Sequence, residues 1–282
     1  MIVWVDGELL DEREARLSPL DRGLVVGDGV FETLRVYGGV PFAWRRHIER
    51  LAHSAAGLGL AVPDAAVLRA AADAVLAANS LPEARLRLTV TAGAGPPGSS
   101  RGGAVPSAFV FAAALDPAPP TTRAAVAPWT RNEHGATAGL KTISYAANVR
   151  ALAYAEARGA SEALFANTAG NLCEATGSNV FLVVGDELIT PPASAGCLLG
   201  VTRGLLLELA PEAGVRAVER DVPMAALATA SEVILTSTTR EVQAVECIVA
   251  DGEPDLAFDA PGPVAQRLAP AFTALVARDL DP

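Results

Sequence analysis

The chain has 282 residues, of which 51% are hydrophobic and 19% are charged, and its formal net charge is -10. This length suits one large domain or two small ones with a sizeable core, and the acidic balance argues against a nucleic-acid-binding protein. No apolar run approaches the roughly 18 residues of a membrane-spanning helix, and the first residues lack the basic and apolar segments of a secretory signal.

The three cysteines, Cys173, Cys197 and Cys247, are odd in number and far apart in the chain. This spacing is typical of reduced thiols in a cytoplasm rather than of a disulfide framework. With only three histidines and no close pair of cysteines, the chain also lacks the motif of a structural zinc site. We therefore expect a cytoplasmic protein with no metal site and with neither nucleic-acid nor membrane partners.

The first half of the chain alternates between strand and helix patterns. An apolar run at residues 2–5 precedes the hairpin dipeptide Asp6-Gly7, and two further strand-like runs flank Gly38-Gly39. Apolar residues then recur at helical spacing over residues 45–60, and a second helix is predicted from Asp64 to Ala78. Strands are predicted at residues 85–92 and 107–115.

A proline-rich segment separates this half from the next, because three prolines within residues 116–122 cannot continue a helix or a central strand. We predict a small N-terminal α+β domain over residues 1–115, an interdomain linker over 116–122 and a larger mixed α/β domain over 123–282. In the second domain, strands are predicted at 123–129, 162–167, 179–184, 187–190, 232–237 and 241–249, and helices at 145–158, 202–209 and 264–278.

Lys141 is the only lysine in the chain, so the other 21 of the 22 lysines and arginines are arginine. Arginine keeps its proton at any accessible pH, whereas burial can lower the pKa of a lysine until its neutral amine attacks a carbonyl carbon. Lys141 precedes a predicted helix that Thr142 or Ser144 could cap, and the positive end of the helix dipole favours a neutral amine. Lys141 is therefore a candidate for covalent chemistry, the alternative being a chance remnant on a solvated turn.

Three other segments of the second domain could bind a charged ligand. Glu174 lies between an apolar pair and a small polar cluster, although a lone glutamate is more often a solvated surface residue. The helix that begins after Gly200 offers N–H groups for an anion site or merely has an ordinary cap. Residues 236–239 place four hydroxyls at the end of an apolar strand, where they bind phosphate or form a turn. An amine, an acid and two phosphate-donor clusters together match the needs of pyridoxal phosphate.

Six blocks of the sequence occur in the order of a known enzyme family: DRGLVVGDGVFETLRV, HIERL, LKTISYAANVRA, EALFANTAGNLCEATGSNVF, GCLLGVTR and LTSTTREV. In these blocks, and over nearly its whole length, the chain resembles the class IV, branched-chain-like pyridoxal-phosphate enzymes of fold type IV. The resemblance implies that Lys141 is the Schiff-base lysine and proton shuttle and that Glu174 pairs with the pyridine nitrogen. It also implies that Leu198 packs against the cofactor ring. The phosphate contacts that it implies are Arg50, Val201, Thr202, Ser237 and Thr238.

The family includes D-amino-acid, (R)-amine and L-branched-chain transaminases as well as 4-amino-4-deoxychorismate lyase. The block GDGVFETLRV resembles the D-amino-acid transaminases and the lyases more than the branched-chain enzymes. The resemblance therefore implies a D-amino-acid-aminotransferase-like enzyme that moves an amino group between a D-amino acid, or an (R)-amine, and a 2-oxo acid. The lyase, which releases pyruvate and 4-aminobenzoate, is the alternative, and a branched-chain L-amino-acid transaminase is a remoter one.

Two features depart from the D-amino-acid transaminases. The arginine and histidine that bind the substrate carboxylate in those enzymes correspond here to Ala92 and Ala94. Arg22 and Arg101 are the candidates to hold the carboxylate instead, although Arg22 could form an ion pair with a neighbouring aspartate and Arg101 could be a loop-tip charge. Phe31 is a further candidate substrate residue.

Other features of the family bear on assembly and on catalysis. Its site lies at a dimer interface, so the resemblance implies at least a homodimer. An asparagine often stands three residues after the catalytic lysine in lyases and D-transaminases, where this chain has Ser144. A non-catalytic binding protein on the same scaffold would be expected to lack Lys141 or Glu174, and both are present.

Overall fold

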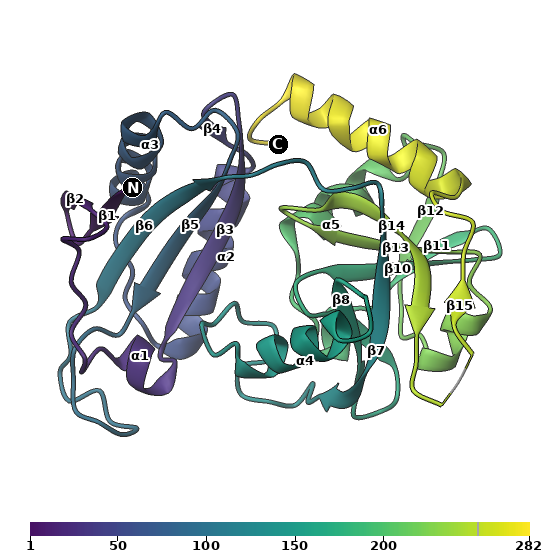
Figure 1. The fold of residues 1–282 in the computed structure, drawn as a ribbon, viewed down its shortest axis with the longest axis horizontal. Coiled ribbons are helices and arrows are strands. Elements are labelled where there is room, and N and C mark those ends of the chain that lie inside the picture. The colour runs from purple at the N-terminus through teal and green to yellow at the C-terminus, as the bar shows by residue number, and fades with distance from the viewer. Residues whose placement is uncertain (253) are drawn as a thin grey trace. The chain divides into compact units, whose positions relative to one another are not determined.

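The computed structural model of the chain describes residues 1–252 and 254–282. These residues form two units, which Figure 1 traces from the N-terminus to the C-terminus. The first unit comprises Met1–Asp116, Leu140–Tyr145 and Asp279–Pro282, and the second comprises Pro117–Gly139 and Ala146–Arg278. The sequence places the two short segments of the first unit in the second domain instead, because residue spacing does not reveal the main-chain pairing described below.

The first unit contains a six-stranded sheet in the order β2-β1-β6-β5-β3-β4, and all of its pairings are antiparallel. Both hairpins predicted from the sequence are confirmed, and the residues of their turns have positive φ angles. The strands are β1 (Ile2–Val5), β2 (Glu8–Asp11), β3 (Gly29–Tyr37), β4 (Val40–Pro41), β5 (Ala84–Thr91) and β6 (Ser107–Ala114), and the helices are α1 (Arg22–Val26), α2 (Trp44–Leu58) and α3 (Ala65–Asn79).

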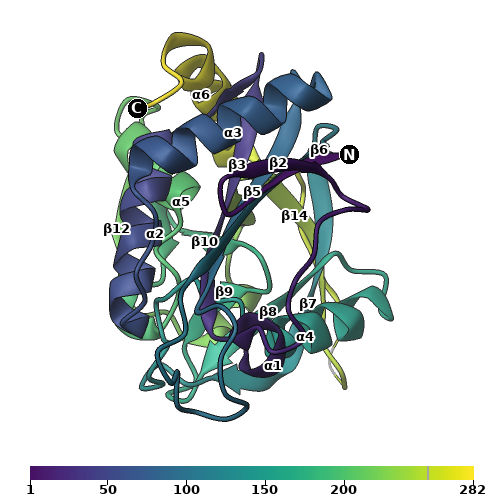
Figure 2. The same ribbon diagram turned by 90° about the vertical axis from the view of Figure 1, so that its left-hand side faces the viewer.

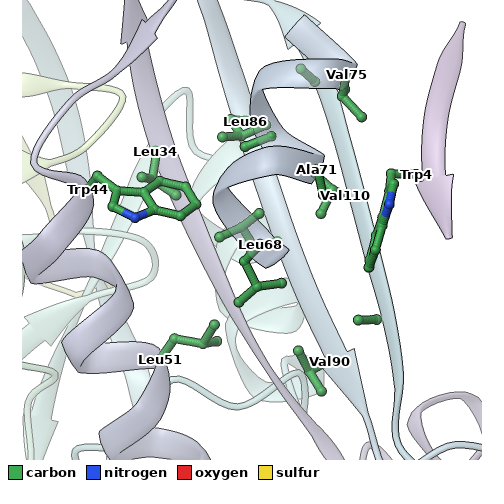
Figure 3. Close-up of a cluster of buried hydrophobic side chains, with 14 of the residues drawn as sticks. Trp4, Leu34, Trp44, Leu51, Leu68, Ala71, Val75, Leu86, Val90 and Val110 are labelled. Atoms are coloured by element: carbon green, nitrogen blue, oxygen red, sulfur yellow. The ribbon is translucent and has the colours of Figure 1, made fainter. Parts of the chain in front are cut away.

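Helices α2 and α3 lie over one face of this sheet (Figure 2). Because side chains alternate along a strand, Val30 and Leu34 of β3 face these helices, and so does Glu32 between them. Truncation of a fully buried leucine in such a core costs about 2 to 5 kcal/mol. Figure 3 shows the core on this face, which includes Trp4, Leu34, Leu51, Leu68, Leu86, Val90 and Val110.

The second unit contains a sheet in the order β12-β11-β10-β13-β14-β7-β8-β9, with β15 paired to β14. Its strands are β7 (Thr121–Arg131), β8 (Glu162–Asn167), β9 (Leu172–Ala175), β10 (Asn179–Val184), β11 (Glu187–Thr190), β12 (Arg216–Glu219), β13 (Glu232–Ser237), β14 (Glu241–Val249) and β15 (Leu256–Ala257). Its helices are α4 (Ala146–Glu156), α5 (Val201–Leu209) and α6 (Pro263–Arg278), with 3-10 turns at Ala193–Ala195 and Met224–Ala228.

The central strands of this sheet are apolar on both faces, which explains continuous runs such as NVFLVV in β10. Phe181 and Ile234 pack with residues of α5 and α6 on one face, whereas Leu182 and Leu235 pack with Leu227 on the other. The strands and helices predicted for this half are confirmed, each within two residues at either end. The structure adds α1, β9, β12, β15 and the 3-10 turns, which are too short to show a periodicity. No helix of the described residues has the length and apolar character needed to cross a bilayer.

Candidate active site

Lys141 belongs to the first unit, where hydrogen bonds of its main chain hold it in place. Its carbonyl oxygen accepts a hydrogen bond from Phe31 N at 3.1 Å, and its amide donates to Ser54 Oγ of α2 at 3.0 Å. The next residue, Thr142, forms a β-bridge with Val30. The segment that contains Lys141 therefore extends alongside the start of β3, and its half-buried lysine is not on a solvated turn.

The Lys141 side chain lies over an aromatic ring. Its Nζ is 4.3 Å from the centroid of the Phe31 ring, and Arg87 Cζ lies 3.4 Å from the same centroid. Tyr145 meets this ring edge-on, with the centroids 5.1 Å apart. Since β3 lies between β5 and the segment of Lys141, the guanidinium and the amine reach Phe31 from neighbouring segments on either side of its strand.

Arg87 is a further candidate site residue, one that was not predicted from the sequence. Burial lowers the pKa of Arg87 to about 10, so its side chain remains a cation at neutral pH. Its Nε also donates to Thr89 Oγ1 at 3.1 Å. The signal was present in the alternation RLRLTVT, which places Arg85 and Arg87 on the face of β5 opposite Leu86 and the helices. Proximity to Lys141 could not be read, because it depends on a pairing with a distant segment.

Arg50 belongs to a buried cluster with Glu32 and His47. Its Nε and Nη2 donate to the two oxygens of Glu32 at 2.8 and 2.7 Å, and Glu32 Oε2 lies 2.7 Å from His47 Nδ1. Burial alone would raise the pKa of Glu32, but Arg50 and then His47 outweigh it, so the pKa lies below its ordinary value of 4.5. Burial lowers the pKa of His47, which favours a neutral ring beside the ionised carboxylate.

This cluster fits the predicted role of Arg50 at a phosphate. A guanidinium has five N–H donors, and the two that bind Glu32 fix the plane of the Arg50 side chain. Ser54 follows Arg50 by one helical turn on α2, and its Oγ accepts the hydrogen bond from Lys141 N. Arg50 and Lys141 are thus tied to the same face of one helix.

Arg22 and Arg101, predicted as substrate residues, have structural partners instead. Both guanidinium groups bind Asp28, Arg22 through Nε at 3.1 Å and Arg101 through Nη2 at 2.7 Å. The ion pair considered for Arg22 is therefore formed, and Arg101 shares the same aspartate. Arg101 also donates through Nε to Asp28 Oδ2 at 2.9 Å. The other bonds go to main-chain carbonyls of Pro96, Gly98, Ser99 and Ser100 for Arg22, and of Leu58 and Gly59 for Arg101.

In the second unit, Glu174 lies in β9 and is not a solvated surface residue, since only 14% of its side chain is exposed. Its Oε1 is 3.3 Å from Arg131 Nε, and its Oε2 accepts a hydrogen bond from Leu198 N at 2.9 Å. The Arg131 guanidinium also stacks over the Phe165 ring at 4.2 Å. The carboxylate is therefore oriented by a cation and an amide, and Leu198 contributes its main-chain N–H to the site.

The start of α5 has the features of an anion site. Gly200 precedes the helix without a side-chain cap, so Val201 and Thr202 begin it with N–H groups that lack an intrahelical acceptor. A Cβ on Gly200 would come within 2.1 Å of Asn179 Oδ1, so only glycine fits there. Asn179 pairs across the sheet with Thr236, whose buried hydroxyl has no partner among residues 1–252 and 254–282. An unsatisfied buried hydroxyl beside an uncapped helix suits a phosphate group.

The predicted residues Ser237 and Thr238 lie where β13 ends, next to Thr236. Ser237 Oγ accepts a hydrogen bond from Arg240 N at 3.2 Å, which closes a turn over the intervening residues. The hydroxyl cluster therefore forms a turn, as one of its two interpretations held. The same turn places its hydroxyls at the end of β13, which pairs with β10 and contacts α5.

The family model described as amino-transferase class IV matches residues 29–248 of this chain. This span includes Lys141, Arg50, Glu174 and both phosphate-donor segments, and it leaves out Arg22.

Curated relatives carry three different names. A Methanocaldococcus jannaschii protein, provisionally named a branched-chain-amino-acid aminotransferase, is 34% identical over 249 residues, which are 86% of each chain. The D-alanine aminotransferase of Bacillus licheniformis is 30% identical over 275 residues, or 96% of each chain. The aminodeoxychorismate lyase of Bacillus subtilis is 32% identical over 248 residues, which are 86% of this chain and 84% of that one.

Among solved structures, the branched-chain aminotransferase of Thermoproteus uzoniensis, determined with norvaline, superposes with a TM-score of 0.88 at 31% identity. The match covers 98% of this chain and 94% of that one. The predicted mixed α/β fold of type IV is thereby confirmed.

Proposed function

Because this chain belongs to the class IV aminotransferases, which depend on pyridoxal phosphate, we propose that it transfers an amino group between a D-amino acid and a 2-oxo acid. The position of Lys141 carries this proposal, since its main chain is fixed beside β3 while its Nζ lies over Phe31 and close to the Arg87 cation. The match to a D-alanine aminotransferase over 96% of each chain supports the choice of D-amino acids.

The residues of both units have distinct tasks in this proposal. Pyridoxal phosphate, when bound, supplies an aldehyde and a ring that stabilises negative charge on the substrate α-carbon. Lys141 Nζ takes the proton from that carbon and returns one, as general base and then general acid. Glu174 would hold the protonated ring nitrogen through the carboxylate that Arg131 and Leu198 N orient.

Three kinds of group suited to an anion would hold the phosphate. These are the guanidinium that Glu32 orients, the N–H groups at the start of α5 and the hydroxyls at the end of β13. By residue, they are Arg50, Val201, Thr202, Ser237 and Thr238. Their combination of a cation, main-chain amides and neutral hydroxyls is what a phosphate ester requires.

Arg87 is the residue that we assign to the substrate carboxylate. Arg22 and Arg101 are occupied by Asp28 and by carbonyl groups, whereas Arg87 is the guanidinium that shares the Phe31 ring with Lys141. A half-buried cation favours an anionic partner. Simple (R)-amines lack this carboxylate, so we expect them to be poorer donors than amino acids.

Aminodeoxychorismate lyase activity is the second candidate, because a lyase matches at 32% identity and needs the same lysine. A branched-chain L-amino-acid transaminase is the third, supported by the 34% identical relative and the Thermoproteus structure. In all three reactions, Lys141 removes a proton from the α-carbon of a substrate that carries a carboxylate. The position of Lys141 is therefore compatible with each of them.

The half-reaction of the holoenzyme separates the three candidates. Purified holoenzyme is mixed in turn with D-alanine, D-glutamate, L-leucine and aminodeoxychorismate, and the absorbance of the aldehyde and pyridoxamine forms of the cofactor is followed. We expect rapid conversion to the pyridoxamine form with the D-amino acids and little with L-leucine. Conversion with L-leucine alone would establish the branched-chain activity instead. Pyruvate release from aminodeoxychorismate without conversion by any amino acid would establish the lyase.

We also propose a homodimer with the site near its interface. Helix α1 exposes three consecutive apolar side chains, Leu24, Val25 and Val26, which are 66%, 42% and 45% accessible. A second copy of this chain is the partner expected for such a surface, because α1 leads directly through Asp28 into the segment of β3 that carries Phe31. We also propose a cytoplasmic location, because the three cysteines form no disulfide.

A further inference from the structure

A chain of polar contacts begins at Glu174 in the second unit. Arg131, whose Nε pairs with Glu174 at 3.3 Å, donates through Nη1 to Asn148 Oδ1 of α4 at 3.1 Å. Asn148 Nδ2 then donates to the carbonyl oxygen of Thr176 at 2.5 Å. The Thr176 hydroxyl donates to Oε2 of Glu162, the first residue of β8. Glu174 is thus connected to Glu162 through side chains of β7, α4 and the loop after β9.

The chain continues from Glu162 to the turn after β13. Arg240 Nε donates to Glu162 Oε1 at 3.1 Å, and Arg240 N donates to Ser237 Oγ at 3.2 Å. The rest of the Arg240 guanidinium is fixed as well, with Nη1 bound to Gln243 Oε1 at 2.6 Å and Nη2 to the carbonyl oxygen of Ser161 at 2.9 Å. The turn that presents Ser237 is therefore anchored to Glu162 through a rigidly held arginine.

Glu162 is the central member of this chain. Only 3% of the residue is exposed, and its two oxygens accept four hydrogen bonds. The donors are Thr176 Oγ1, Gly177 N, Ser178 Oγ and Arg240 Nε. This number fills the lone-pair sites of a carboxylate. Such full satisfaction offsets the cost of burying the charge, yet Glu162 has no task among the chemical steps described above.

We propose that Glu162 is a positioning residue that sets where the Ser237 turn lies relative to Glu174. This inference rests on the proposed function, in which Glu174 binds the ring nitrogen and the turn binds the phosphate of one cofactor. A ligand with both groups fits only if the two anchors keep a fixed separation. Because one buried carboxylate binds both the loop after β9 and Arg240, it holds that separation through two short links.

Replacement of Glu162 by Gln tests this role with little change in volume. The amide substitutes an N–H donor group for one acceptor oxygen, so two donors face each other at Thr176 and Gly177 or at Ser178 and Arg240. Arg240 also loses its anionic partner. We expect the Ser237 turn to lose its fixed position, whereas the ring-nitrogen site keeps Arg131 and Leu198 N.

Glu232 provides a matched control in the same unit. It is also buried, at 6% exposure, and its two oxygens accept hydrogen bonds from Val264 N and Ala265 N at the start of α6. Glu232 opens β13, and Ser237 closes the same strand. Glu232→Gln therefore disturbs a buried carboxylate of comparable structural importance at the end of β13 remote from the turn.

The experiment compares the affinities of the full-length apoproteins for pyridoxal phosphate and for pyridoxal, which lacks the phosphate, by quenching of tryptophan fluorescence. The dissociation constant of pyridoxal divided by that of pyridoxal phosphate measures what the phosphate contributes to the affinity. We expect Glu162→Gln to reduce this ratio about tenfold, since charge-assisted hydrogen bonds of the turn are lost. Glu232→Gln should lower the melting temperature of the apoprotein but leave the ratio unchanged. Addition of inorganic phosphate should raise the melting temperature of the wild type and of Glu232→Gln, and less that of Glu162→Gln.

The outcomes distinguish this inference from the proposed function. A ratio in Glu162→Gln equal to that of the wild type, or an equal fall in Glu232→Gln, would overturn the positioning role while cofactor binding stands. Failure of the wild type to bind pyridoxal phosphate would overturn both. If Glu162→Gln does not fold, Arg240→Met replaces it, because Arg240 is partly exposed and a methionine side chain cannot pair with Glu162. An unchanged ratio in that variant would likewise overturn the inference.

Discussion

The two units hold their functional groups in different ways. In the first unit, Lys141 is fixed by main-chain pairing along β3 and by one bond to Ser54. In the second, Glu174 and the Ser237 turn are held by a succession of side chains. Main-chain bonds survive side-chain substitution, whereas a side-chain network depends on each of its members. We therefore expect the position of Lys141 to tolerate side-chain changes around it better than the positions of Glu174 and the Ser237 turn do.

The largest effect is expected for Lys141 itself. Lys141→Ala should lower the rate of the half-reaction by about a thousandfold or more, because no other amine is placed to move the proton. Lys141→Arg should be equally inactive, since it keeps the cation and the main-chain bonds but stays protonated. Stopped-flow absorbance with D-alanine measures both rates.

The affinity of these variants for pyridoxamine phosphate sharpens the comparison between the units. If the second unit supplies most of the anchoring, this affinity should be unchanged in Lys141→Ala, as measured by fluorescence titration. A loss comparable to that of Glu162→Gln would show that the division of tasks between the units is wrong.

The buried cluster of the first unit should respond next most strongly. Glu32→Gln leaves Arg50 beside a neutral amide, and removal of one partner from such a pair should lower the free energy of unfolding by about 3 kcal/mol. Asp73→Asn is the control, because Asp73 and Arg69 are both more than a third exposed in their ion pair, and its loss should cost under about 1 kcal/mol. Urea denaturation at pH 7 measures both values.

The pH dependence of the Glu32 contribution follows from its lowered pKa. The stabilisation is fully present above the ordinary value of 4.5 and is lost as the pH falls toward the lower pKa of the folded state, because only the unfolded chain then takes up a proton. The stability difference between the wild type and Glu32→Gln should therefore be constant near neutrality and shrink below pH 4.5. A difference that grows in acid would contradict an ionised Glu32.

A smaller effect is expected for Arg87, the cation proposed to bind the substrate carboxylate. Arg87→Ala should raise the KM for D-alanine about tenfold to a hundredfold, because it removes a charge-assisted bond to the carboxylate, and leave the affinity for the cofactor unchanged. Arg85→Ala, an exposed position on the same face of β5, should behave as the wild type. Steady-state kinetics measure these KM values. An equal KM for Arg87→Ala and the wild type would contradict the assignment of Arg87 to the substrate carboxylate.

The smallest effect concerns the surface of α1. Leu24→Asp should weaken self-association about tenfold, because a charge replaces an apolar side chain at the proposed interface. Val67→Asp in α3, another exposed apolar position, is the control and should not alter it. Sedimentation velocity over a range of concentrations measures the equilibrium, and a monomeric wild type would remove this surface from the proposal.

Sequence periodicity predicted most of the fold, and residue chemistry singled out Lys141 as the candidate reactive group, which stays a prediction. The long elements were accessible because their apolar residues recur at 2.0 or 3.6 positions. Short elements such as α1 and β9 have too few residues to show either period. Chemistry singled out Lys141 because a lone lysine in an arginine-rich chain can do what arginine cannot.

The parts of the site that remained hidden depend on contacts between distant segments. Arg87 reaches Phe31 only because β5 pairs with β3, and Arg101 reaches Asp28 across 73 positions of the chain. The same holds for the segment of Lys141, which groups with the first unit through its pairing with β3. Local pattern shows which side chains share a face but not which strand comes alongside.

The half-buried setting of Lys141 also limits how this protein can be attached to other materials. The chain has two primary amines, Lys141 and the terminal amine of Met1, which lies 3.7 Å from Glu12. Resins, dyes and cross-linkers that react with amines can thus couple only at the N-terminus or at Lys141, the proposed catalytic residue. Immobilisation for use as a biocatalyst would keep its activity best through carboxylates, in which the chain is rich, with 32 aspartates and glutamates.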